Sequence, residues 1–175
     1  MKKSVRVRAT RYCIALTMGV GLSAVASSAL AGSCSVSSSG LMFGAYEPIT
    51  FAGKLTSIDR TSTATVSVVC TNIAAGGGYT IGLGASNYGS GDRLSIRYLN
   101  NTPNGGDLMA FNVFTNASYT TVWGNGFTGA VLNGTIATGD SNQSHTVYGQ
   151  IPAGQSTLKA GSFSDSLTVT LTYNP

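Results

Sequence analysis

The feature that most constrains the fold of this chain is a strict alternation of polar and apolar residues near its C-terminal end. A serine or threonine separates each apolar residue from the next between Asp165 and Tyr173. The apolar residues of this run are Leu167, Val169, Leu171 and Tyr173. The two-residue period predicts a β-strand with one apolar face. Only Asn174 and Pro175 follow, so we expect an uncovered strand edge, on which a strand of another chain can dock.

The same period recurs in short segments along the chain, and no segment shows a sustained helical period. The expected strands are 41–46, 64–70, 79–83, 94–98, 108–114, 121–123, 145–151 and 166–173, with 129–136 as an ambiguous edge strand. Clusters of glycine, proline and asparagine separate them. Short alternating strands divided by such turn residues predict an antiparallel β-sandwich.

The first 31 residues have the composition of a secretory signal peptide. Five cations precede an apolar stretch over 12–25, and Ala29-Leu30-Ala31 supplies small residues for signal peptidase. The apolar stretch is too short for a stable membrane span. We expect cleavage after Ala31, with a cut after Ala26 as the alternative. Residues 32–175 then form a single domain that is long enough to bury a core.

Removal of the predicted signal changes the formal charge of the chain from +4 to −1. Five of the ten Lys and Arg residues lie in the signal, whereas all six Asp and Glu residues follow it. Binding of nucleic acid requires a basic patch, and five scattered cations do not form one. The sequence therefore predicts no nucleic-acid partner.

The mature chain retains two cysteines, Cys34 and Cys70. An even number of cysteines behind a secretory signal favours a disulfide, because the compartment outside the cytoplasm is oxidising. Two cysteines and one histidine are too few for a structural zinc site. We therefore expect Cys34 and Cys70 to be bonded.

None of the chemically reactive residues has the neighbours that catalysis needs. His145, the only histidine, falls within an expected strand, and no serine stands out as its nucleophile. Asp59 and Asp92 read as solvated turn residues, and Asp165 as a turn cap. Trp123, at the end of a short strand, is expected to pack rather than to stack on a sugar. The sequence predicts a protein that is not an enzyme.

Several segments together resemble the spore coat protein U domain family, over essentially the whole mature chain. They are Cys34-Ser-Val-Ser with Phe43-Gly-Ala-Tyr-Glu-Pro48, Val66-Ser-Val-Val-Cys70, the run 108–114, Val122-Trp-Gly-Asn-Gly126, Val147-Tyr-Gly-Gln-Ile-Pro-Ala-Gly-Gln155 and the run 160–173. The last two are the most specific. The family pattern often has arginine at the position of Gln150 and tyrosine at that of Phe163.

This resemblance implies an immunoglobulin-like antiparallel sandwich that lacks its final strand, as in the subunits of archaic chaperone–usher pili. It implies three partners: a periplasmic chaperone, an outer-membrane usher and another subunit that supplies a donor strand. It implies passage through the periplasm to the cell surface, a role in adhesion or biofilm, and no cofactor. The expected groove residues are Val36, Leu41 and Phe43 of the first strand, with Leu167, Val169, Leu171 and Tyr173 opposite.

A polymerising subunit of this kind carries an alternating apolar extension before its first cysteine. After the expected cleavage only Gly32 and Ser33 precede Cys34. We therefore expect a subunit that accepts a strand without donating one, which suits the tip of a fibre. Three alternatives stay open: a secreted coat or surface-layer protein that completes its own sheet or swaps strands as a dimer, a carbohydrate-binding module, and an unrecognised hydrolase.

Overall fold

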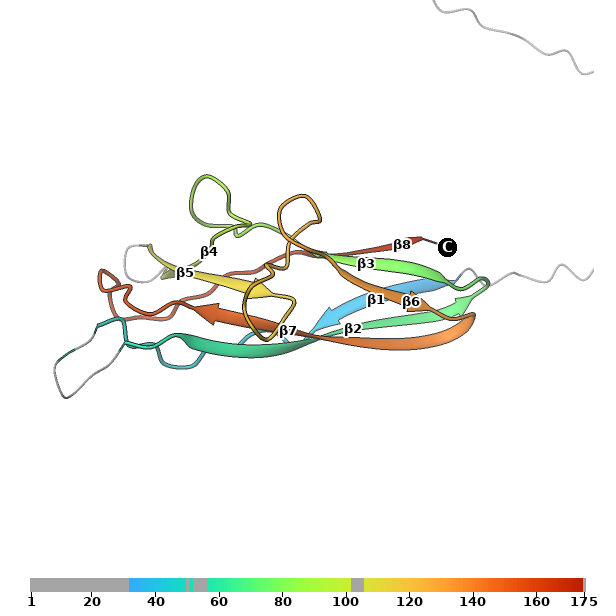
Figure 1. The fold of residues 1–175 in the computed structure, drawn as a ribbon, viewed down its shortest axis with the longest axis horizontal. Helices are drawn as coiled ribbons and strands as arrows, with labels where there is room; N and C mark the ends of the chain where they lie inside the picture. Colours follow the sequence, from blue (N-terminus) through green and yellow to red (C-terminus); the bar gives the residue numbers. More distant parts are fainter. Residues whose placement is uncertain (1–31, 50, 52–56, 102–105, 175) are drawn as a thin grey trace, which may run out of the picture.

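The computed structural model describes residues 32–49, 51, 57–101 and 106–174, and the predicted signal at 1–31 lies outside them. Eight β-strands and no helix occur within these ranges. The strands are β1 (Ser33–Ser38), β2 (Arg60–Ile73), β3 (Gly77–Leu83), β4 (Arg97–Asn101), β5 (Asp107–Phe114), β6 (Leu132–Ile136), β7 (Gly139–Ile151) and β8 (Val169–Asn174). The predicted antiparallel sandwich is confirmed (Figure 1).

The strands form two antiparallel sheets of unequal extent. The five-stranded sheet has the order β1-β2-β7-β5-β4, and the three-stranded sheet has the order β6-β3-β8. In Figure 1, β3 and β8 lie toward the right, whereas β4 and β5 lie toward the left. The left half of the five-stranded sheet is therefore not covered by the strands of the smaller one. β1 and β8 are edge strands, each paired with a single neighbour.

The core lies between the two sheets and follows the alternation of the sequence. In β2, the side chains of Ala64, Val66, Val68 and Cys70 are buried by alternation, and Ile73 is buried beyond an irregularity in the register. In β3, the buried side chains are those of Tyr79, Ile81 and Leu83. Burying one large apolar side chain stabilises a fold by roughly 1.5–3 kcal/mol. These two faces therefore hold the sheets together, and the expected alternation in both strands is confirmed.

The first strand differs from the prediction. It spans Ser33–Ser38, whereas the segment 39–49, which contains the expected strand 41–46, is not a strand. Gly40 and Gly44 have φ values of 75° and 69°, which interrupt the extended conformation. The segment nevertheless continues beside β2, because Ser39 N donates to Thr65 O and Met42 N donates to Ser62 Oγ.

The strand expected at 94–98 is also wrong, because β4 begins at Arg97. The carboxylate of Asp92 accepts hydrogen bonds from the backbone N–H groups of Leu94 and Ser95, which closes a turn there. The segment 121–123 forms only single bridges and no strand. The uncertain segment 129–136 does contain an edge strand, β6.

The last strand is shorter than predicted and begins at Val169. Just before Val169, side chains form hydrogen bonds with the backbone of Ser166. Asp165 Oδ1 accepts from Ser166 N, and Asn87 Nδ2 donates to Ser166 O. These bonds replace ladder pairing before Val169. From Val169 onward the predicted alternation is confirmed, with every second side chain half-buried.

Candidate functional site

A groove of about 1050 Å³ opens where the five-stranded sheet is left uncovered. One wall is the segment 38–49 that follows β1, and the other is the segment 158–169 that leads into β8. The floor consists of buried apolar side chains from both sheets. They include Ala64, Leu83, Met109, Phe111, Val113, Trp123, Val147 and Ile151. No strand of the described ranges closes this side of the sandwich between β1 and β8.

The first wall rests on a glycine of β7. A Cβ atom built on Gly149 would lie 2.7 Å from Phe43 Cζ and 2.8 Å from Leu41 Cδ1. Because Gly149 has no side chain, the side chains of Leu41 and Phe43 can pack directly against the backbone of β7. The ring of Phe43 then packs edge-on against Phe111 of the floor, with centroids 6.1 Å apart.

Tyr46 and Gln155 fasten the same wall to the end of β7 and to the middle of β5. Tyr46 Oη donates to Pro152 O at 2.8 Å, and Gln155 N donates to Tyr46 Oη at 3.1 Å. The side-chain amide of Gln155 forms two further bonds with the backbone of Ala110, at 2.7 and 3.0 Å. The end of the segment Val147–Gln155, which the sequence analysis singled out, therefore joins the first wall to the five-stranded sheet.

The second wall is held by backbone hydrogen bonds to both sheets. Ser164 and Asn100 exchange two bonds, at 2.9 and 3.1 Å, next to β4. Gly84 N donates to Thr168 O at 2.8 Å, just beyond the end of β3. The wall therefore has a fixed position although it is not a regular strand, and Phe163, Leu167 and Val169 line the groove from it.

Arg97 is a buried charge beside the floor that the sequence did not single out. Its side chain is 0% exposed. The guanidinium donates to the carbonyl oxygens of Gly84 and Trp123 at 2.9 Å, and also to Asn112 Oδ1. Burial lowers the pKa of Arg97 to about 10, opposed by the charges of Asp165 and Asp92. The guanidinium therefore stays protonated at neutral pH.

These bonds let Arg97 satisfy carbonyl groups at the end of β3, where ladder pairing stops. Asp165 lies near this charge, in the second wall, and its carboxylate accepts hydrogen bonds from Ser86 Oγ and Asn87 Nδ2. Its carboxylate also accepts from Ser166 N, but residues 165–168 form no turn, so Asp165 joins the second wall to Ser86 and Asn87 rather than capping a turn as predicted. An arginine in a half-apolar strand carries no sequence signal for burial, so sequence reasoning missed it.

Four of the predicted groove residues lie together in the groove lining, namely Leu41, Phe43, Leu167 and Val169. The other three, Val36, Leu171 and Tyr173, pack against the core outside that lining. Tyr173 is held there, because its Oη donates to Ala75 O at 2.6 Å. The groove is thus confined to the half of the sandwich that the smaller sheet leaves open.

The predicted disulfide is confirmed. Cys34 in β1 and Cys70 in β2 are bonded and lie directly opposite each other in the antiparallel register. The bond fastens an edge strand that otherwise has only one neighbour. It thereby anchors the strand from which the first wall of the groove departs.

Three further predictions concern single residues. Trp123 packs as expected: it is buried, and its Nε1 donates to Ile81 O at 2.9 Å. His145 lies within β7, as predicted, and its Nε2 contacts Tyr79 Oη. Asp59 is exposed, but its carboxylate is not merely solvated, because it accepts from Gln150 Nε2 at 2.7 Å and from Ala153 N at 2.8 Å.

The arrangement suits an extended peptide with alternating apolar residues. An apolar floor accommodates every second side chain, and the adjoining edge strand β8 has its second edge free of any described strand. Among the described residues, no group of three or more His, Cys, Asp or Glu side chains is placed to hold a metal ion. No helix of the described ranges is long and apolar enough to cross a membrane.

Comparison with known proteins gives one family match. The profile of the Spore Coat Protein U domain matches residues 21–170. No curated protein matches the sequence. Among solved structures, a similar chain occurs in the chaperone–tip adhesion subunit pre-assembly complex CsuC–CsuE from archaic chaperone-usher Csu pili of Acinetobacter baumannii. That similarity has a TM-score of 0.46 at 18% identity and covers 81% of this chain and 40% of the other.

Proposed function

We propose that this chain, which belongs to the Spore Coat Protein U domain family, is a secreted structural subunit of an archaic chaperone–usher pilus or related surface fibre. Its partners are then a periplasmic chaperone, an outer-membrane usher and a neighbouring subunit. It passes through the periplasm to the cell surface after removal of residues 1–31. In this proposal it acts in adhesion or biofilm formation and has no catalytic function.

The observation that carries this proposal is the open groove between the two edges of the sandwich. Side chains such as Phe111, Val113 and Ile151 are part of the core, yet they also line the groove. A strand laid between the two walls would cover them and pair with an edge. This is β-strand addition, in which backbone hydrogen bonds supply affinity and side-chain pockets supply specificity.

The energetic gain from such a strand is large. Each apolar side chain that becomes fully buried contributes about 1.5–3 kcal/mol, and an alternating strand buries several of them. We therefore expect the chain to depend on a chaperone before assembly, because the chaperone supplies the missing strand.

We further propose that the chain accepts a strand but does not donate one, as a subunit at a fibre tip would. The support is the sequence around the expected cleavage site, since Cys34 is already part of β1. Terminal sequencing of the secreted protein tests the cleavage site. Regular fibres grown from the purified mature protein alone would contradict the acceptor-only role.

A pair of aspartate substitutions in β8 tests the groove. Val169 lines the groove, whereas Thr170 is exposed on the opposite face of the strand. Val169→Asp places a charge where the apolar strand must bind, which is strongly unfavourable. We expect it to abolish co-purification with the periplasmic chaperone, whereas Thr170→Asp leaves co-purification nearly unchanged.

A second test fuses a complementary strand behind a flexible linker at the C-terminus of the unaltered chain. This fusion should give a soluble monomer with a higher melting temperature than the unfused chain. Equal loss of co-purification from both substitutions would reject the groove as the chaperone site. A stable monomer that needs no chaperone would favour the coat-protein alternative.

A further inference from the structure

We propose that the outer face of the five-stranded sheet binds a neutral oligosaccharide. The binding platform is an aromatic cluster formed by Phe114 at the end of β5, Tyr119 in the loop 115–121, and Tyr148 in β7. This site is separate from the groove, and the inference does not depend on the pilus role.

The three rings are gathered by strand pairing and by the loop. Phe114 and Tyr148 are directly opposite each other in the β5–β7 register. The ring of Tyr119 lies edge-on to both, with centroids 5.7 Å from Phe114 and 6.4 Å from Tyr148. All three side chains are half-buried and so retain accessible surface. A cluster of partly exposed rings offers the apolar surface on which the C–H face of a sugar ring can stack.

The loop that carries Tyr119 is fixed by one side chain. Asn116 Oδ1 accepts from the backbone N–H groups of Thr120 and Thr121, and Asn116 Nδ2 donates to the hydroxyls of Ser118 and Thr120. Tyr119 has a φ of 55° at the turn of this loop. A tyrosine in this region of backbone space carries strain of about 1–3 kcal/mol. The ring is therefore held in place before any ligand arrives, which lowers the entropic cost of binding.

The residues that adjoin the cluster on β2 and β7 are uncharged and carry hydroxyl groups. Tyr148 alternates with the buried Val147, so it faces outward, and its partner Thr63 in β2 lies on the same face. Thr65 and Thr146 form the next outward pair on this face. Hydroxyl groups beside aromatic rings are the combination that orients a sugar through hydrogen bonds while its apolar face stacks.

The charge near the cluster favours a neutral ligand over an acidic one. Gln150, two residues beyond Tyr148 on the same face, donates to the carboxylate of Asp59. This carboxylate would repel the uronic or sialic acids of an acidic glycan. The phenol oxygens of Tyr119 and Tyr148 make no hydrogen bond to the described part of the chain, so both can bond to a ligand.

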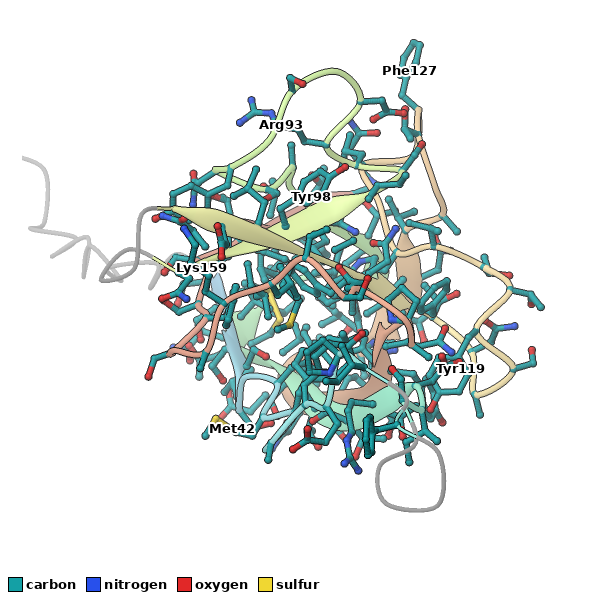
Figure 2. The ribbon with its side chains drawn as sticks, turned by 90° about the vertical axis from the view of Figure 1, so that its left-hand side faces the viewer. Met42, Arg93, Tyr98, Tyr119, Phe127 and Lys159 are labelled. Carbon is teal, nitrogen blue, oxygen red and sulfur yellow. A yellow bond between two sulfur atoms is a disulfide. The ribbon has the colours of Figure 1, made fainter. Side chains whose placement is uncertain are left out.

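The aromatic cluster and the groove lie on different sides of the molecule. Figure 2 shows Tyr119 on the right-hand flank, whereas Met42 and Lys159, which border the groove, lie on the left. A strand bound in the groove therefore leaves the cluster accessible. The protein can be tested with its groove filled, by the chaperone or by a fused strand.

Titration calorimetry and saturation-transfer NMR with cellohexaose and chitohexaose test the proposal, with an oligogalacturonate as the acidic comparison. We expect saturable binding of at least one neutral hexasaccharide and weaker binding of the acidic one. Tyr119→Phe and Tyr148→Phe keep the ring packing and remove one hydroxyl each. Each should raise the Kd about two- to tenfold, as expected for the loss of one hydrogen bond, with an unchanged melting temperature.

Tyr119→Ala removes the ring itself and should abolish measurable binding. Thr172→Val, on the exposed face of β8 in the other sheet, is the matched control and should leave the Kd unchanged. The proposal is overturned if neither hexasaccharide binds, if the acidic oligosaccharide binds more tightly, or if the three tyrosine variants bind as the unaltered protein does.

Discussion

The phenol oxygen of Tyr79 lies 2.7 Å from Nε2 of His145, and this hydrogen bond joins β3 of the small sheet to β7 of the large one. The two rings also pack edge-on, with centroids 5.8 Å apart. The ring of Tyr79 passes over Gly134 of β6, where a Cβ atom would collide with it. The hydrogen bond therefore joins the two sheets on the side where the smaller sheet covers the larger one, away from the groove.

The partly buried hydrogen bond between Tyr79 and His145 predicts a loss of stability in mild acid. Burial lowers the pKa of His145 below its usual 6.5 in the folded state, so the unfolded chain binds the proton more tightly. The free energy of unfolding should therefore fall as the pH drops from about 6.5 through the lower folded pKa. Urea unfolding between pH 7.5 and about 5.5 measures this change. The variant His145→Gln should lack it, and an equal slope in both proteins would contradict the assignment.

Removal of the disulfide should weaken the sandwich at its β1 edge. Cys34 and Cys70 are 36 residues apart, and a closed loop of this size stabilises a fold by roughly 4 kcal/mol in the chain-entropy model. We expect the double variant with serine at both positions to lose about 2–5 kcal/mol of unfolding free energy and to accumulate poorly in the periplasm. Non-reducing peptide mapping checks the bond itself, and free thiols at both positions would contradict it.

Gly149→Ala should damage the groove more than the fold. The new methyl group would meet the tips of Leu41 and Phe43, which can give way only by tilting up into the groove. We expect a stability loss of about 1–3 kcal/mol and a clear loss of chaperone co-purification. Gly78→Ala in β3 is the control, because the carbonyl oxygen of Gly134, the nearest non-adjacent atom to a new Cβ there, would be 4.0 Å away. Unchanged co-purification of Gly149→Ala would show that this wall is not part of the binding site.

Arg97→Met should be strongly destabilising. It leaves the carbonyl groups of Gly84 and Trp123 and the amide of Asn112 without their buried donor. Leaving a buried acceptor without its donor costs about 1–3 kcal/mol for each group. Arg93→Met, at a half-exposed turn position, should change the unfolding free energy by less than about 0.5 kcal/mol. Chemical denaturation measures the unfolding free energy of both variants. Similar losses in the two would show that Arg97 does not organise this region.

The residue pattern was sufficient to predict an antiparallel sandwich and most of its strands, but not β1 or the places where strands begin and end. The period of two in β2, β3 and β8 identified their buried faces, because burial of one face selects that period directly. The ends of strands depended on side-chain hydrogen bonds to the backbone and on glycines with positive φ. The alternation of polar and apolar residues does not reveal either of these. Asp92 closed a turn where a strand was expected, and Gly40 and Gly44 interrupted another.

For the groove, the sequence by itself determined which side chains are apolar and on which face of a strand they lie. Only the tertiary structure decided that Leu41, Phe43, Leu167 and Val169 share one opening while Leu171 and Tyr173 do not. The reason is that alternation fixes a face, whereas coverage depends on how far a second sheet extends over it. The burial of Arg97 was likewise decided by tertiary structure, because only the folded chain gathers the distant carbonyl groups that compensate its charge.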